Sequence, residues 1–130
     1  MRHPRVLALA CALLLTAASV SFAHHSVSGQ FDSSKPVTLK GVISKVDWIN
    51  PHIYIHIDVK SDDGSMTTWA LATLPTAMMR RAGLSKESFL GKPGEVVTVE
   101  LLPARDGTQH LGWLEKITFA DGHYHQLAGQ

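Results

Sequence analysis

The feature that most constrains the fold is a strict alternation of apolar and polar residues from His52 to Val59. Every second position holds a branched apolar residue, and the positions between are polar: His52, Tyr54, His56 and Asp58. Successive side chains of a strand point to opposite faces, so this period of two predicts a half-buried β-strand. A chain built around such a strand needs a sheet with one buried face.

Four other segments also have strand character. They are Val37–Trp48, Met66–Ala72, Val97–Leu101 and Leu111–Phe119. In the first of these, the apolar positions change phase beside Gly41, which is typical of a β-bulge that bends a long strand. The Ser61–Ser65 segment, which contains Asp-Asp-Gly, predicts a hairpin between the second and third strands.

The helical signal is confined to one short segment, Thr76–Ala82, which Gly83 ends at a C-cap position. This helix stands between the third and fourth strands. Five strands with a bent first strand and one helix at this point predict an all-β fold, a small five-stranded OB-type barrel. A small open sandwich has the same strand count and is the alternative.

The first residues predict export. Arg2 and Arg5 precede the apolar run Val6–Val20, and Ser21-Phe22-Ala23 has small residues where a signal peptidase needs them. We therefore expect a periplasmic or secreted protein. The expected organisation is a signal peptide at 1–23, an irregular arm at 24–36, the barrel at 37–120 and a tail at 121–130.

Charge and cysteine content restrict the classes of partner and of stabilisation. Lys and Arg number 12 and Asp and Glu 11, and the basic residues form no dense run. This predicts no binding to nucleic acid and, after cleavage of the signal, no binding to membranes. The one cysteine, Cys11, lies in the signal, so the exported chain would have no disulfide and must rely on packing.

Several motifs together resemble an uncharacterised family of small secreted proteins from Gram-negative bacteria, a domain of unknown function. These motifs are Ala23-His24-His25-Ser26, Phe31-Asp32, Lys35-Pro36-Val37-Thr38-Leu39-x-Gly41, Trp48-x-Asn50-Pro51-His52 and Pro103-Ala104-Arg105-Asp106-Gly107. The resemblance implies an exported small β domain and implies no activity. The chain departs from the family pattern after Trp69, where Ala70–Thr73 contain none of the acidic residues that the resemblance leads us to expect.

The first candidate site is a metal site at the new amino terminus. Cleavage after Ala23 would expose the α-amine of His24 beside the imidazoles of His24 and His25. Copper(II) favours nitrogen ligands in a square arrangement, and an α-amine gives up its proton to a metal at modest cost near neutral pH. We predict a copper or similar divalent metal site formed by His24 and His25, with His52 of the barrel as a further ligand. A terminus without function is the alternative.

The second candidate is a ligand face on the second and third strands, formed by Tyr54, His56 and Trp69 together with His52. His52 and His56 stand about 13 Å apart along a strand, so they cannot share one ion. The main hypothesis is thus a binding module for copper or another divalent metal. A metal-free barrel that binds a periplasmic protein or another ligand through this face is the alternative.

Catalytic groups are sparse, and we expect the protein not to be an enzyme. No serine has the sequence context of a nucleophile, and Asp62-Asp63-Gly64 is typical of a hairpin turn. A copper redox enzyme that uses the terminal histidine is a third, weaker hypothesis. His123 and His125 would lie about 6.6 Å apart in an extended tail, a spacing that permits chelation but ranks below the amino terminus.

Overall fold

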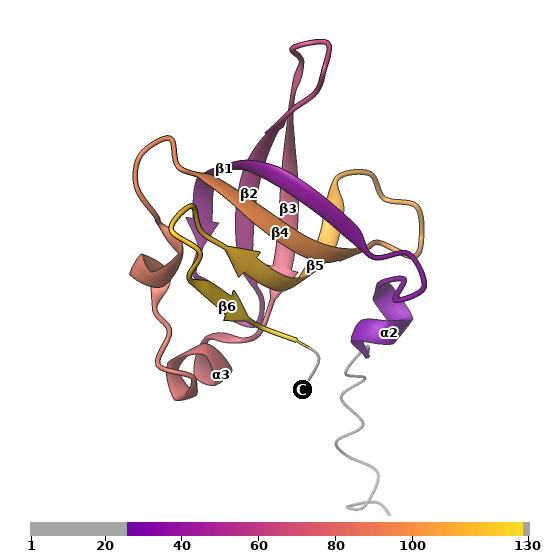
Figure 1. The fold of residues 1–130 in the computed structure, drawn as a ribbon. Helices are drawn as coiled ribbons and strands as arrows, with labels where there is room; N and C mark the ends of the chain where they lie inside the picture. The colour runs from indigo at the N-terminus through magenta and orange to yellow at the C-terminus, as the bar shows by residue number, and fades with distance from the viewer. Residues whose placement is uncertain (1–25, 129–130) are drawn as a thin grey trace, which may run out of the picture.

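The first strand, β1 (Val37–Asp47), has neighbours on both sides and organises the sheet. It pairs in antiparallel fashion with β2 (Ile53–Lys60) over one part of its length and with β4 (Val96–Pro103) over the other. β2 continues into β3 (Met66–Thr73), and β4 continues into β5 (Leu111–Thr118). Two antiparallel strand pairs, β2–β3 and β4–β5, therefore extend from β1, as Figure 1 shows.

A parallel pairing between β3 and β5 joins these two strand pairs into a ring. Ala70 lies opposite Leu111, and Ala72 lies opposite Trp113. The ring runs β1, β2, β3, β5, β4 and back to β1, which is the strand order of an OB barrel. The predicted five-stranded barrel is confirmed, and the open sandwich is wrong because the ring is closed.

The computed structural model describes residues 26–128. The expected signal peptide, with its cleavage site, and both histidines of the predicted terminal metal site lie outside the described residues. Of the helices in 26–128, none is both long and apolar enough to span a membrane.

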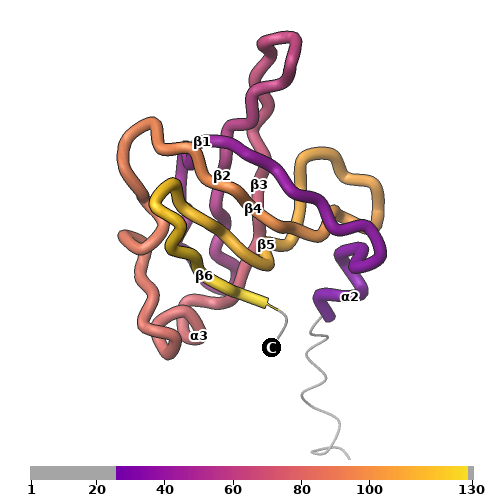
Figure 2. The backbone as a smooth tube through the Cα atoms, in the orientation of Figure 1, coloured from indigo at the N-terminus to yellow at the C-terminus, as the bar shows by residue number. Residues whose placement is uncertain are grey.

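The helices within residues 26–128 are short. They are α2 (Val27–Gln30), α3 (Thr76–Arg81) and the 3-10 helix η1 (Lys86–Phe89). The predicted helix between the third and fourth strands is α3, and both it and η1 direct one buried side chain into the barrel: Met79 and Phe89. The segment between β3 and β4 thus closes one end of the barrel, whereas the β2–β3 hairpin projects beyond the other (Figure 2).

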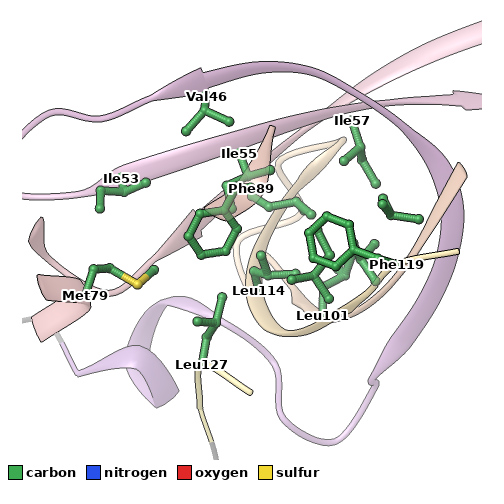
Figure 3. Packing of buried hydrophobic residues seen from close by; sticks show 14 residues of the cluster. Val46, Ile53, Ile55, Ile57, Met79, Phe89, Leu101, Leu114, Phe119 and Leu127 are labelled. Atoms are coloured by element: carbon green, nitrogen blue, oxygen red, sulfur yellow. The ribbon is translucent and has the colours of Figure 1, made fainter. Parts of the chain in front are cut away.

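Alternating residues of the strands fill the barrel. Ile53, Ile55 and Ile57 of β2 are fully buried, as the period of two predicts. Figure 3 shows them packed with Phe89, which comes from η1, and with Leu114, which comes from β5. Each buried side chain of this size stabilises the fold by about 1.5–3 kcal/mol, and without a disulfide in residues 26–128 this packing is the main source of stability.

The bend in β1 depends on a close approach at Gly41. A Cβ atom at this position would lie 2.5 Å from the backbone oxygen of Asp58 on β2. The pairing with β2 then shifts register between Ile43 and Lys45, which is the irregularity that the change of phase beside Gly41 predicts. The bend allows a single strand to pair with β2 and with β4 in the same closed ring.

The sheet extends past the predicted boundary at residue 120. β6 (Tyr124–Gln126) pairs with β5, and Leu127 is 4% exposed within the core. The arm is also more ordered than expected, because α2 forms within it and Phe31 is buried against the outside of the barrel. Both ends of the described chain are therefore part of the packed domain.

We predict that Gly41→Ala destabilises the barrel by about 1–3 kcal/mol, because the added methyl group must displace the β2 backbone. The measurement is urea denaturation followed by tryptophan fluorescence. Gly29→Ala is the control, since its Cβ would approach only the Ser26 side chain, at 3.3 Å. Equal midpoints for Gly41→Ala and the parent protein would contradict the close approach.

Candidate functional site

A row of side chains on the outer surface of the barrel forms the candidate site. Tyr54 of β2 lies opposite Ala72 of β3, and Ala72 lies opposite Trp113 of β5. Residues directly opposite each other in a sheet share a face, so these three side chains form one line across three strands. Because the middle residue is an alanine, the two aromatic side chains stand on either side of a gap.

This gap opens into a hollow of about 280 Å³, which we call the junction hollow. The arm, the β1–β2 loop, three strands and α3 all contribute to its lining: Val27, Gln30, Phe31, His52, Tyr54, Ala72, Leu74, Pro75, Met78, Leu111 and Trp113. The lining is mainly apolar and aromatic, and its polar groups are few. This combination is typical of a site for a small organic ligand.

Phe31 connects the arm to the hollow. Its ring is 5% exposed and its centroid lies 5.9 Å from that of Trp113, in a tilted aromatic contact. Around these two rings, Ala72 and Leu102 complete a small apolar cluster that is separate from the core inside the barrel. The arm therefore forms one wall of the hollow by packing onto the outside of the sheet.

Arg105, in the β4–β5 loop, holds the arm in place through backbone carbonyls. Its guanidinium Nε donates to the Ser28 oxygen at 3.2 Å and its Nη2 to the Phe31 oxygen at 3.3 Å, while its backbone N–H donates to the Gln30 oxygen at 2.8 Å. An isolated bridge pairs Phe31 with Ala104 beside it. These hydrogen bonds act together with the packing of Phe31 to hold the arm against the barrel.

His52 lies at the rim of the hollow with its side chain exposed. It follows Asn50-Pro51 in the β1–β2 loop, and Asn50 Oδ1 accepts a 2.5 Å hydrogen bond from the buried Thr76 hydroxyl at the start of α3. This bond fixes the loop to the helix. The predicted site residue His52 is thus placed where it can touch a ligand in the hollow.

The predicted ligand face is only partly assembled. Tyr54 and His56 do share the outer face of β2, with ring centroids 6.4 Å apart. Trp69 does not join them, because it lies opposite Ile57 and packs partly buried against the core. The prediction for Trp69 is therefore wrong: the hairpin register puts Ala70, not Trp69, opposite His56.

His56 instead belongs to a charged group on the outside of β1 and β2. Its Nε2 lies 2.9 Å from Asp47 Oδ2, and Lys45 Nζ lies 2.8 Å from Asp47 Oδ1. The hydrogen bonds from Lys45 and then from His56 hold the pKa of the Asp47 carboxyl below its ordinary value of 3.8. Asp47 also lies opposite Tyr54, so this group borders the aromatic row.

The predicted metal site is not brought together by the part of the chain that the structure describes. Within residues 26–128 no three His, Cys, Asp or Glu side chains are arranged to hold one ion. His52 and Val27 both line the hollow, and Val27 follows His25 by two positions. A metal on His52 would therefore need ligands from the residues before Ser26.

The lining residues that sequence reasoning missed are those that become neighbours only through the closed ring: Phe31, Ala72, Leu111 and Met78. One signal for them was present. Both outward positions in the middle of β3, Ala70 and Ala72, carry the smallest side chain with a Cβ. Two small residues on one face of a strand leave space above the sheet. The arm lies along one side of this space and so turns it into a hollow.

A comparison with known families gives one match. The model of a family of unknown function, DUF6152, matches residues 11–113. The chain belongs to this family. Its match covers the barrel through Trp113 of the aromatic row, in agreement with the resemblance carried by the sequence motifs. No curated protein and no solved structure matches the chain.

We predict that the Asp47 group stabilises the fold in a pH-dependent way. A carboxyl whose pKa is lower in the folded state than in the unfolded state stabilises the fold at pH values above 3.8. That contribution is lost as the pH falls through the lowered pKa. Asp47→Asn should therefore reduce the urea midpoint at pH 6, and its difference from the parent protein should vanish in strong acid.

The control is Asp62→Asn, which removes an exposed carboxylate of the β2–β3 hairpin. It should leave the midpoint nearly unchanged at both pH values. A difference between Asp47→Asn and the parent protein that stays constant from pH 6 to pH 2 would show that Asp47 does not act through its charge.

Proposed function

We propose that this member of the DUF6152 family is an exported binding module that takes a small, largely apolar ligand in the junction hollow. The observation that carries the proposal is the alanine between two aromatic residues: Ala72 leaves open a space that Tyr54, Trp113 and the arm residue Phe31 enclose. In a well-packed domain such a gap on the sheet is normally filled by a larger side chain.

The chemistry of the lining defines the ligand. Aromatic rings and the half-exposed Met78 offer a polarisable apolar surface, which suits a ring or a branched aliphatic group. Gln30, the Tyr54 hydroxyl and His52 offer the polar contacts that would orient it. The volume of about 280 Å³ suits one such group, not an extended polymer.

Export is part of the proposal and rests on the sequence. The basic start at Arg2 and Arg5, the apolar run Val6–Val20 and the small residues before His24 support a cleaved signal. The near balance of acidic and basic residues favours a small neutral ligand over nucleic acid.

We predict that Ala72→Leu abolishes ligand binding because the larger side chain fills the hollow between Tyr54 and Trp113. The probe is 1-anilinonaphthalene-8-sulfonate, whose fluorescence rises in apolar sites. Ala72→Leu should weaken its binding at least tenfold, a cost of about 1.4 kcal/mol. Near-ultraviolet circular dichroism checks that the fold is retained.

Ala70→Leu is the matched control, because Ala70 lies on the same face of the same strand but outside the lining of the hollow. It should bind the probe as the parent protein does. Equal affinities for the Ala72→Leu variant and the parent protein would place the binding elsewhere and overturn the proposal.

Metal binding is the second candidate function, and the shared position of Val27 and His52 on the hollow favours it. Three residues of extended chain span at most about 11 Å, so the amine and imidazole of His24 stay on a short tether from Val27. Cleavage after Ala23 would then leave these nitrogens close to the hollow that Val27 and His52 both line. Together these nitrogens suit copper(II).

We predict that the exported protein begins at His24 and binds copper(II) at this terminus, where His24→Ala weakens the affinity by orders of magnitude. His52→Ala should cause a smaller loss, because it removes one ligand and leaves the terminal chelate. Amino-terminal sequencing and intact mass come first, followed by a copper titration.

His110→Ala is the control for the copper titration, since His110 is exposed and lies outside the lining of the junction hollow. Its affinity should equal that of the parent protein. Either a mature chain that begins at another residue, or copper binding that His24→Ala does not change, would refute the terminal site.

A further inference from the structure

Two histidines at the β5–β6 turn lie close together, and each ring is held by a hydrogen-bond partner of its own. His123 lies immediately before β6, and His125 lies within it. Their ring centroids are 5.8 Å apart at an interplanar angle of 69°. Neither residue belongs to the junction hollow, so this pair is a separate feature of the molecule.

The hydrogen bond of His125 determines which nitrogen is available. Its Nε2 lies 3.2 Å from the backbone oxygen of Ser88, and a carbonyl oxygen can only accept. Nε2 therefore carries the proton, which leaves the lone pair of the neutral ring on Nδ1. The ring stands edge-on to Phe89 and Phe119, which fix its orientation.

His123 has the complementary arrangement. Its Nδ1 donates to the Asp121 carboxylate, whose pKa is held below the ordinary value first by the His123 backbone N–H and then by this side chain. The lone pair of the neutral ring is thus on Nε2. The ring is stacked on Phe119 with centroids 4.2 Å apart, while half of its side chain is open to solvent.

These two partnerships are the ones that metal-binding histidines usually have. A ligating imidazole almost always donates its other N–H to a carboxylate or a backbone carbonyl, which fixes the tautomer and raises the basicity of the ligating nitrogen. His123 has the carboxylate and His125 has the carbonyl. Both ligating nitrogens are therefore preset before any ion arrives.

The spacing also suits one ion. With a metal–nitrogen distance of about 2.0 Å, each ring centre would lie about 3 Å from the ion, so two rings at a tetrahedral angle would have centres about 5 Å apart. The observed separation of the ring centres, 5.8 Å, exceeds this value by less than about 1 Å, and the half-exposed His123 ring has room to turn toward a shared ion.

The surrounding hollow favours a cation. It encloses about 380 Å³, and its lining contains three carboxylates and one lysine: Glu87, Glu95, Asp121 and Lys92. Glu95 already accepts the backbone N–H groups of Lys92 and Ala120, and Glu87 accepts the Ser85 hydroxyl. These carboxylates contribute negative charge to the hollow, and water molecules would complete the coordination of the ion.

We propose that His123 and His125 form a two-imidazole site for a nitrogen-preferring divalent cation such as Zn²⁺, with Nε2 of His123 and Nδ1 of His125 as the ligands. The site does not depend on the amino terminus or on the junction hollow. Bound metal would join the turn before β6 to β6 itself and thereby stabilise the end of the sheet.

The experiment uses the exported chain with His24→Ala and His25→Ala as the reference, so that zinc cannot bind at the amino terminus. Zn²⁺ is titrated while the ring nitrogens are followed by ¹⁵N NMR. The expected result is that Nε2 of His123 and Nδ1 of His125 shift together, with one ion bound, while the rings of His52 and His110 do not respond.

Affinity measurements on single variants complete the test. His123→Ala, at an exposed ring, and His125→Ala, at a ring in contact with Phe89, should each weaken zinc binding at least tenfold, whereas His110→Ala should not. If His125→Ala loses the fold, His123→Ala and the NMR shifts still decide. Unchanged affinity in His123→Ala, or zinc shifts on other imidazoles, would overturn the proposal.

Discussion

The parallel pairing of β3 with β5 is the interaction on which the rest of the structure depends. It joins residues about forty positions apart in sequence and closes the strand pairs β2–β3 and β4–β5 into one ring with β1. It also brings Ala72 and Trp113 side by side, so the closure that buries the core also forms the aromatic row outside it. The fold and the candidate site therefore have the same origin.

The outside of the barrel acquires a site because the arm returns to it. A strand face with small residues at its centre would be only a shallow depression in an isolated barrel. Arg105 holds the arm by its carbonyl groups, and Phe31 then adds an aromatic wall. The Arg105 guanidinium also lies 3.9 Å from the Asp32 carboxylate, so both the backbone and a side chain of the arm contribute to this clamp.

How much could be predicted from the sequence depended on the range of the interactions. The alternation in β2, the bulge near Gly41 and the α3 helix are local patterns, and they were enough to predict an OB-type barrel. The face of Trp69 depended on the register of a hairpin with a five-residue connection, and a shift by one residue reverses the face. β6 was missed because three residues with one histidine at their centre carry no periodic signal.

Sites were harder to predict than strands, for a physical reason. Ala72 was visible in the sequence as a departure from a family pattern and as one of two small residues on one strand face. Its place between two aromatic side chains became evident once β5 put Trp113 opposite it. His52 was a candidate site residue in the sequence because it follows a turn and carries an imidazole, and the structure places it in the lining of the hollow. The side chain of an alanine has no functional group. It contributes to a site only through the space that it leaves open between larger neighbours.

For the histidine pair near β6, the residues were visible in the sequence but their surroundings were not. The spacing of His123 and His125 along the chain gave no information about which ring nitrogens are free. Ser88 comes from η1 and Asp121 from the turn after β5, and each accepts one imidazole N–H.

Because the junction hollow and the hollow around this histidine pair have no lining residue in common, each can be altered without changing the other. The two proposed sites, for an apolar group and for an ion, would thus lie at separate places, one outside the ring and one at the turn into β6.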